Sequence, residues 1–306
     1  MTLYLAVCTR ISGNELVTAE CESLTGGRPA ADGVARCQTI AHVSRAAYVQ
    51  TGLRLIAEEH TLPSLIEAVA SQEFDATDFC IAELRLSRAN PVRWREAVVG
   101  IANAIQAFPN LDFPKHRFLL VIRQDSLCFG EVLAEADHSY QQHSSKPYHL
   151  SSSLPARLAR GLVNLVTPPA GSILDPCCGT GSVILEACAL GLQAEGSDWN
   201  PRMVGMARKN LAHFGYPARV TRTDARQGTR PADAVVTDLP YGHFSPLDEG
   251  NVRAILQNCA RLAPLGVFVA GADISAWLRQ AGYIKVEVFR VQKRDTFSRY
   301  VHRAHV

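Results

Sequence analysis

Two acceptors for a planar amine follow an apolar run in the second half of the chain. Residues 233–241 read DAVVTDLPY, which places Asp238, Pro240 and Tyr241 at the end of a predicted strand. A carboxylate and a proline carbonyl accept hydrogen bonds and donate none, so they can hold both N–H groups of an exocyclic base amine and turn its lone pair towards a methyl donor. Tyr241 offers a flat face on which the base can stack. We therefore predict amine methylation, with Asp238, Pro240 and Tyr241 as catalytic residues.

A glycine turn stands upstream of this motif. Residues 172–187 read SILDPCCGTGSVILEA, which is an apolar strand ending in Asp175, a tight turn and an apolar helix. Glycines let the backbone approach a ligand, and open α/β sheets bind cofactors at the carboxyl ends of their strands, beside helix N-termini with unpaired N–H groups. The predicted cofactor contacts in this segment are Asp175, Cys177, Gly179, Thr180 and Gly181.

Two later strand ends supply carboxylates. Asp198 stands 19 residues after Gly179, where it can accept hydrogen bonds from both hydroxyls of a ribose, and Trp199 adds a large flat side chain. Asp224 is placed to reach an adenine amino group, and Ala225 offers its N–H to the ring. These four residues are therefore predicted to bind a nucleoside cofactor. The dinucleotide fingerprint GxGxxG is the competing interpretation, but its third glycine is absent.

The elements that position these residues alternate after residue 150. We predict helices at 154–166, 181–190, 201–214, 249–263 and 273–281, and strands at 172–175, 193–198, 218–223, 233–238 and 265–271. This alternation is typical of a mostly parallel sheet with helices on both faces. Two last apolar segments, 285–293 and 299–306, have no helix between them and are expected to pair antiparallel at the sheet edge.

The first half mixes strands and helices without strict alternation. We predict strands at 3–8, 34–43, 79–86, 117–122 and 127–133, and helices at 14–24, 62–71 and 90–107. The last two strands form a hairpin around the turn residues 124–126. This mixture indicates small α+β units, and the polar stretch at 138–153 marks the boundary with the second half.

Composition restricts the class of protein. The 306 residues are 47% hydrophobic and 20% charged, which suits one large or two ordinary domains. The sequence shows neither an 18-residue apolar run nor a signal-peptide pattern, so we expect a cytoplasmic protein. Nine scattered cysteines without zinc spacing predict neither disulfides nor a metal site. Residues 151–306 carry 18 Lys and Arg against 12 Asp and Glu, which favours a polyanionic partner.

Taken together, the glycine turn and the amine motif make residues 146–306 resemble a class I S-adenosylmethionine-dependent methyltransferase. The amine motif is similar to the [DNS]PP[YF] signature, with Leu239 replacing the first proline. KPYHLSSSLPARLARGLVNL at 146–165 resembles, more narrowly, the THUMP-containing tRNA guanine-N2-methyltransferases of the guanosine-10 and guanosine-6 type. The resemblance implies S-adenosylmethionine as cofactor, N2 of a tRNA guanosine as target and a seven-stranded Rossmann-like domain at 141–306. It also implies that 146–153 caps the cofactor pocket, with Tyr148 and Ser151 as contacts.

The front half resembles the remainder of these enzymes. NLDFPKHRFLLVIRQDSLCFGEVL at 110–133 is similar to the closing strands of a THUMP domain. The resemblance implies an α+β region with a ferredoxin-like module at 1–60 and a short THUMP-like module at 61–140. It further implies tRNA as partner and raises the need for a small activating protein subunit, which some relatives require. Candidate RNA contacts are Arg85, Arg88, Arg93, Arg95, Arg117, Arg219, Arg222, Arg226, Arg230, Arg290, Lys293, Arg294, Arg299 and Arg303.

Three alternatives stay open at this point. Adenine-N6 DNA methyltransferases and protein-glutamine methyltransferases use related amine-binding loops on the same fold. DNA enzymes usually carry a separate target-recognition domain, and glutamine enzymes have Asn at the start of the loop, where this chain has Asp238. The third alternative is a non-catalytic RNA-binding subunit that keeps the fold, against which the intact glycine turn and amine motif both argue.

Overall fold

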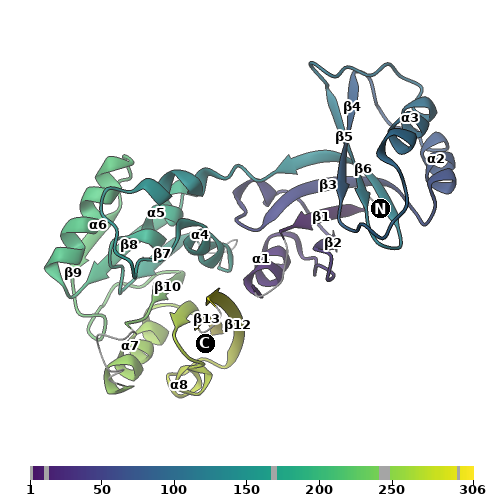
Figure 1. Ribbon diagram of the computed structural model, residues 1–306. Helices are drawn as coiled ribbons and strands as arrows, with labels where there is room; N and C mark the ends of the chain where they lie inside the picture. The colour runs from purple at the N-terminus through teal and green to yellow at the C-terminus, as the bar shows by residue number, and fades with distance from the viewer. Residues whose placement is uncertain (1–2, 10–13, 167–170, 241–248, 295–296) are drawn as a thin grey trace. The chain divides into compact units, whose positions relative to one another are not determined.

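The computed structural model describes residues 3–9, 14–166, 171–240, 249–294 and 297–306. The chain forms two compact units (Figure 1). Unit 1 comprises residues 1–10, 25–44 and 49–136, and unit 2 comprises residues 11–24, 45–48 and 137–306. Unit 1 ends at Ala136, so the polar stretch predicted as a boundary, 138–153, begins two residues later and lies in unit 2.

Unit 1 is built on one mixed sheet. Its strands are β1 (Tyr4–Cys8), β2 (Val34–Cys37), β3 (Val49–Glu59), β4 (Phe79–Arg85), β5 (His116–Ile122) and β6 (Leu127–Glu135). They lie in the order β2-β1-β3-β6-β5-β4, and the predicted hairpin is confirmed as the antiparallel pair β5 and β6. β4 runs parallel to β5 at the other edge. Strands from residues 1–60 and from residues 61–140 thus share one sheet.

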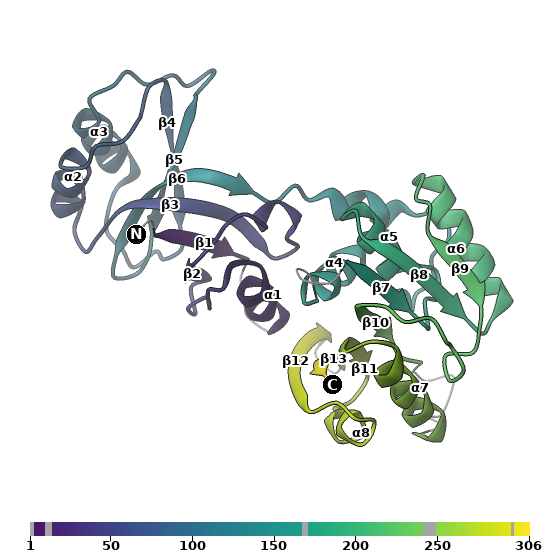
Figure 2. The same ribbon diagram turned by 180° about the vertical axis from the view of Figure 1, so that it is seen from behind.

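One face of this sheet carries two helices, α2 (Leu62–Ala70) and α3 (Trp94–Ala104), which lie side by side (Figure 2). Leu65 and Ile101 of these helices are fully buried against Phe118 and Phe129 of the sheet. Pro63 stands in the first turn of α2, and the Thr61 side chain accepts a hydrogen bond from the Ser64 N–H, which fixes the start of the helix.

Unit 2 contains a seven-stranded, mostly parallel sheet, as predicted. Its strands are β7 (Ser172–Asp175), β8 (Gln193–Asp198), β9 (Arg219–Arg222), β10 (Ala234–Asp238), β11 (Leu265–Ala270), β12 (Lys285–Arg294) and β13 (Phe297–His305). The order is β12-β13-β11-β10-β7-β8-β9. β13 pairs antiparallel with both β11 and β12, which confirms the antiparallel edge predicted from the missing helix.

Helices cover the two faces of this sheet. On one face lie α4 (Ala156–Asn164), α5 (Ser182–Ala189) and α6 (Pro201–His213), and on the other lie α7 (Glu249–Leu262) and α8 (Ser275–Gln280). Ile184 and Leu185 of α5 pack with Val204 of α6, while Leu256 of α7 packs on Val235 and Phe268. The carboxyl ends of the parallel strands β7, β8, β9 and β10 therefore meet along one edge between these layers.

The helix α1 (Leu16–Thr25) belongs, through Leu24, to unit 2 although it comes early in the chain. Its fully buried Glu20 accepts hydrogen bonds from the N–H groups of Ala47 (2.8 Å) and Tyr48 (2.6 Å) and from Nδ2 of Asn164 (2.7 Å). The carboxylate thus joins α1 and the segment 45–48 to α4. No pattern in the sequence predicted this attachment, because Asn164 stands 144 residues after Glu20.

Candidate functional site

A cavity of about 690 Å³ lies at the carboxyl edge of the unit 2 sheet. Most of the residues predicted from sequence line it. These are Asp175, Cys177, Gly179, Thr180, Asp198, Trp199, Asp224, Ala225, Asp238 and Pro240. Three predicted cofactor contacts, Tyr148, Ser151 and Gly181, are not among its lining residues, and Tyr241 lies outside the described residues.

The glycine turn takes the conformation that its residues permit. Gly179 has φ +52° and nothing within 4 Å of where a Cβ would be, so the backbone there is open to the cavity. Gly181 has φ +85° and caps α5, and a Cβ at this position would lie 3.3 Å from Cβ of Ala207. Gly181 is thus required by backbone conformation and helix packing.

The Asp198 carboxylate closes the turn. One oxygen accepts the Gly179 N–H at 3.0 Å and the other accepts the Asn200 N–H at 2.8 Å. Burial nevertheless raises the pKa of Asp198, because the two backbone donors do not fully replace lost water. Each carboxylate oxygen retains a further lone pair, so the group can still accept from a vicinal diol.

Asp175 is the most deeply buried carboxylate of the cavity, at 2% exposure. Burial raises its pKa to about 7, against the lowering effect of hydrogen bonds from Oγ1 of Thr237 (2.7 Å) and the Cys177 N–H (3.2 Å). The charges of Asp238 and Asp198 raise the pKa further. A cation bound in the cavity would stabilise the charged form of Asp175.

Asp224 follows β9 and is held by Arg226. The guanidinium donates to both carboxylate oxygens at 2.6–3.0 Å, and this lowers the pKa of Asp224. The neighbouring Ala225 is buried, and its carbonyl accepts from Nδ2 of Asn258 in α7 at 2.9 Å. Asp224 and Ala225 are therefore fixed at the cavity by a side chain on each side of the loop.

Asp238 ends β10 and Pro240 follows it, both at the same cavity. The Leu239 N–H between them donates to the Val269 carbonyl at 3.0 Å, and Leu239 itself is buried in the core under α7. Leu239 therefore anchors the loop by an apolar contact and a strand-like hydrogen bond. The accepting groups on either side of it are held at the carboxyl edge.

The segment 146–153 lines the cavity, but through residues other than the predicted Tyr148 and Ser151. Ser152 and Ser153 line it, and the Ser153 hydroxyl lies 3.0 Å from the Thr180 hydroxyl. Tyr148 instead pairs through its backbone with Asn210 of α6 at 2.7 and 2.9 Å, and Ser151 is exposed. The residues of this segment that line the cavity are therefore Leu150, Ser152 and Ser153 in place of the predicted Tyr148 and Ser151.

The other lining residues were not predicted as catalytic or cofactor-binding residues, although Arg226 and Arg299 among them were predicted as RNA contacts. They are Leu150, Ser152, Ser153, Leu154, Pro176, Cys178, Ser182, Val183, Asn200, Met203, Arg226, Leu239, Asn251, Val252, Ile255 and Arg299. Arg299, predicted as a phosphate contact, is only 4% exposed. Its alternation with the buried Val301 in β13 was the available signal, since both side chains share a face of the strand.

The adjacent cysteines of the glycine turn act as small apolar side chains. Burial raises the pKa of both the Cys177 and Cys178 thiols well above the ordinary value, so neither ionises readily. Among the described residues, no group of three or more His, Cys, Asp and Glu side chains is arranged to hold a metal ion, and no helix is long and apolar enough to cross a membrane.

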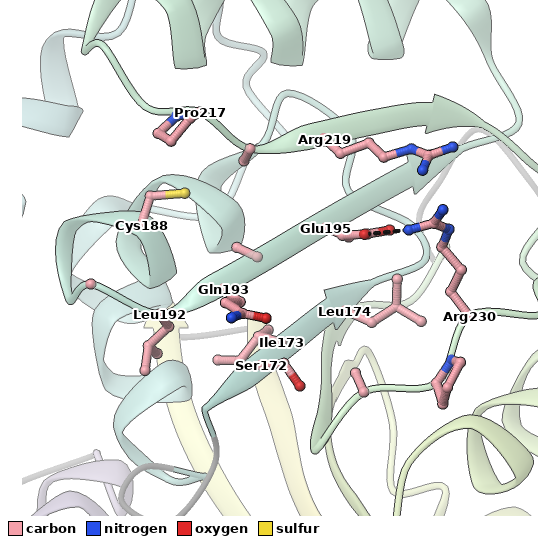
Figure 3. A pocket seen from close by; sticks show the side chains of 15 residues that line it. Ser172, Ile173, Leu174, Cys188, Leu192, Gln193, Glu195, Pro217, Arg219 and Arg230 are labelled. Carbon is pink, nitrogen blue, oxygen red and sulfur yellow. Dashed lines mark hydrogen bonds and ion pairs between the residues drawn. The ribbon is translucent and has the colours of Figure 1, made fainter.

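A second hollow lies on the sheet face of β7, β8 and β9, away from the carboxyl edge (Figure 3). Leu174, Glu195 and Arg219 form one row across these strands. Figure 3 shows the Arg230 guanidinium pointing at Glu195, with an ion pair of 2.6 Å. The described loop 223–233 contains no helix, and Glu195 and Arg219 of this row are partly or fully exposed, whereas Leu174 is buried in the core under α7. None of the predicted catalytic or cofactor-binding residues lies here, whereas Arg219 and Arg230, predicted as RNA contacts, line this hollow.

Residues 144–263 match the family model of the RMKL-like methyltransferase domain, UPF0020. The matched stretch includes the glycine turn, Asp198, Asp224 and the loop that begins at Asp238. It also includes α4 to α7, that is, most of the helices that surround the cavity.

Two curated relatives are similar in sequence to part of this chain. It is 39% identical over 115 residues to the tRNA (guanine(10)-N2)-dimethyltransferase of Methanothermobacter thermautotrophicus. It is 34% identical over 164 residues to the enzyme of the same name from Methanocaldococcus jannaschii. These matches cover 36% and 48% of this chain and 34% and 46% of the relatives. The chain thus spans less than half the length of these two relatives.

Two solved structures resemble the whole chain in fold. TrmN from Thermus thermophilus has a TM-score of 0.51 at 18% identity, covering 99% of this chain and 100% of that protein. SMU.472, in its complex with SAH, has a TM-score of 0.50 at 13% identity, covering 99% and 97%. At such identities the likeness shows the fold alone. It confirms the predicted class, a Rossmann-like class I methyltransferase domain preceded by a smaller α+β region.

Proposed function

We propose that this protein transfers a methyl group from S-adenosylmethionine to the exocyclic N2 amine of a guanosine in cytoplasmic tRNA. The observation that carries the proposal is the placement of Asp238 and Pro240 in the same cavity as Asp198 and Asp224. Asp238 and Pro240 suit an amine that must receive a methyl group, and Asp198 and Asp224 suit an adenosine. The identity to two guanine-N2-methyltransferases over the same region supports guanosine as the target.

The residues of the cavity fit S-adenosylmethionine in charge as well as in hydrogen bonding. Four carboxylates line it, and the cofactor carries a sulfonium cation and an ammonium group; the four are Asp175, Asp198, Asp224 and Asp238. We assign the ribose hydroxyls to Asp198 and the adenine to Asp224 and Ala225. The open backbone at Gly179 leaves room beside them. When bound, the cofactor supplies an electrophilic methyl group.

The chain's own contribution is positioning and polarisation. Asp238 and the Pro240 carbonyl accept the two N–H bonds of the amine, so that its lone pair faces the methyl group. Neither acceptor can donate a proton that would compete for the lone pair. After transfer, the surplus proton passes to Asp238 or to water. Tyr241 is proposed to stack on the extracted base.

We further propose that unit 1 is the RNA-binding part, with its ferredoxin-like and THUMP-like modules fused in one sheet. Arg88, Arg93 and Arg95 are exposed there. Arg85 serves another purpose, because its guanidinium donates to the carbonyls of Asn90 and Val92 and so holds its own loop. Dependence on a small activating protein subunit is the alternative that the assay below distinguishes.

Methyl transfer from radiolabelled S-adenosylmethionine tests the reaction, with unmodified tRNA transcripts, duplex DNA and a protein extract in parallel. We expect label in N2-methylguanosine from tRNA. Label in DNA or protein would overturn the tRNA assignment. Cofactor binding without transfer to any substrate would contradict an autonomous enzyme and favour the partner subunit or a non-catalytic RNA-binding protein.

Asp238→Asn tests the catalytic assignment within that assay. It replaces one accepting oxygen with a donor, so turnover should fall about a hundredfold or more while cofactor affinity stays within about twofold. Asp198→Asn is the matched variant for the cofactor side, and it should weaken cofactor binding measured by calorimetry. Full turnover in Asp238→Asn would refute its role.

A further inference from the structure

Arg299 lies in β13, two strands away from the strand of Asp238, and lines the same cavity. β10 and β11 pair Asp238 with Val269, and β11 and β13 pair Val269 with Val301. These three residues therefore lie on one face of the sheet, and Arg299, two residues before Val301, shares that face. Continued by one residue, the β11–β13 register places Arg299 just beyond the carboxyl end of β11.

This arginine is a buried group of the cavity wall. Its side chain and backbone are together 4% exposed, and it lines the same cavity as Asp238 and Pro240. A guanidinium that contacts phosphate on the surface would be accessible to bulk solvent, as Arg290 on the neighbouring strand is. Burial inside the cavity instead suits a contact with the base that enters it.

The chemistry of the two sides of the cavity is complementary. Asp238 and the Pro240 carbonyl only accept hydrogen bonds, whereas a guanidinium only donates them and stays charged at all working pH values. Guanine carries a donor amine at position 2 and two acceptors, O6 and N7, on another edge. Adenine has an amine in place of O6, so a buried arginine aimed at that edge would lose an acceptor and face a donor.

We propose that Arg299 is the specificity-determining residue that selects guanine by donating to O6 and N7 of the target base. The proposal rests on the proposed function, since it assumes that the amine held by Asp238 belongs to a guanosine. It assigns a separate task to the last strand of the fold: β10 supplies the acceptors for the reacting amine, and β13 supplies the donor that identifies the base.

A substrate lacking one of the two acceptors provides the test. tRNA transcripts made with 7-deazaguanosine keep Watson–Crick pairing but have no N7. With the wild-type protein, kcat/KM for methylation of these transcripts should be about tenfold lower than for ordinary transcripts. Arg299→Gln should lower kcat/KM on ordinary transcripts by about tenfold to a hundredfold and show no further loss on 7-deazaguanosine transcripts.

The non-additivity distinguishes contact with the base from a structural role. If Arg299 only supports the fold, the two losses multiply, and that outcome would overturn the proposal. Arg290→Gln, an exposed arginine on β12, is the matched control and should keep the wild-type sensitivity to N7 removal. Arg299→Lys, which retains the charge, replaces Arg299→Gln in the test if the Gln variant proves unfolded in a thermal-unfolding measurement. The Lys variant should lose most of the sensitivity to N7 removal, because an ammonium group cannot donate to O6 and N7 in bidentate fashion.

The ordinary transcripts with wild-type protein separate this proposal from the function on which it rests. No N2-methylguanosine in that arm refutes the proposed function. The proposed function would stand and the role of Arg299 alone would be refuted by two results together. Wild-type protein would methylate ordinary and 7-deazaguanosine transcripts equally well, and Arg299→Gln would leave kcat/KM unchanged.

Discussion

Lys146, whose partner Ser182 lines the cavity, shows how a single buried residue carries an electrostatic cost. It is 7% exposed, and its ammonium donates to the hydroxyl of Ser182, the first residue of α5. Burial lowers its pKa to about 8 from the ordinary 10.5, while the charge of Glu186 acts in the opposite direction. A positive charge at a helix N-terminus is also unfavourable towards the helix dipole.

The lowered pKa predicts how stability depends on pH. Between pH 8 and 10.5 the unfolded chain holds the lysine proton more firmly than the folded chain, so the free energy of unfolding rises with pH. Relative to Lys146→Met, the wild type should gain on the order of 3 kcal/mol over this interval. Urea unfolding at a series of pH values measures the difference. The exposed Lys285→Met should follow the wild type, and parallel curves for Lys146→Met and wild type would contradict the expectation.

At the scale of elements, one buried carboxylate joins three segments of unit 2. Glu186 of α5 accepts from Nε of Arg160 in α4 at 2.8 Å, and one of its oxygens lies 2.7 Å from Nδ1 of His143 in η2 (Ser139–Ser145). All three side chains are at most 2% exposed. η2 falls in the polar stretch that the sequence marks as a boundary, and the buried His143 shows that this stretch is packed into unit 2.

Removing the charge of Glu186 should therefore destabilise the fold strongly. In Glu186→Gln the Arg160 guanidinium stays buried without its nearest counter-charge, and only the half-exposed Asp137 carboxylate remains at 4.0 Å, so the loss is roughly 3–5 kcal/mol in unfolding free energy. Glu195→Gln is the matched variant, because its pair with Arg230 has a similar distance but is about half exposed, and it should change stability by at most about 1 kcal/mol. Equal effects of the two substitutions in chemical denaturation would show that burial is not the deciding factor.

Elements with a regular hydrophobic period were predictable from the sequence, and β3 was not. The strands and helices of unit 2 follow the predicted alternation to within a few residues. In β3 the pairing register with β6 shifts between Leu55 and Ala57, where Ile56 is an extra residue, and this interrupts the period-two pattern by which a strand is recognised. The site follows the same rule. Asp198 and Asp238 were predictable because each ends a recognisable strand, whereas Ser153 and Arg299 reach the cavity only through the tertiary fold.

The whole molecule is divided in space differently from its division in sequence. Unit 2 includes residues 11–24 and 45–48 from the early part of the chain, and these supply buried contacts to α4. A Cβ on Gly161 would lie 2.7 Å from the Tyr48 ring and 3.2 Å from the Leu16 side chain, so α4 packs on both early segments. Arg157 of α4 also donates to the Ala47 carbonyl at 3.0 Å. Unit 2 therefore includes two segments, 11–24 and 45–48, that come before residues 49–136 of unit 1 in the sequence.

A fragment that begins at Asp137 should therefore be a poor representation of unit 2. It lacks Glu20, so the Asn164 amide loses its carboxylate acceptor. It also lacks Tyr48 and Leu16, so the surface of α4 around Gly161 is exposed to solvent. We expect its unfolding free energy to be lower than that of unit 2 in the full chain by about 3 kcal/mol or more, with binding of a hydrophobic dye. Glu20→Ala in the full chain should reproduce part of this loss, because three donors lose one acceptor. An unfolding midpoint of residues 137–306 equal to that of the full chain would show that the early segments are dispensable, and the unit would then be a domain in sequence as well as in space.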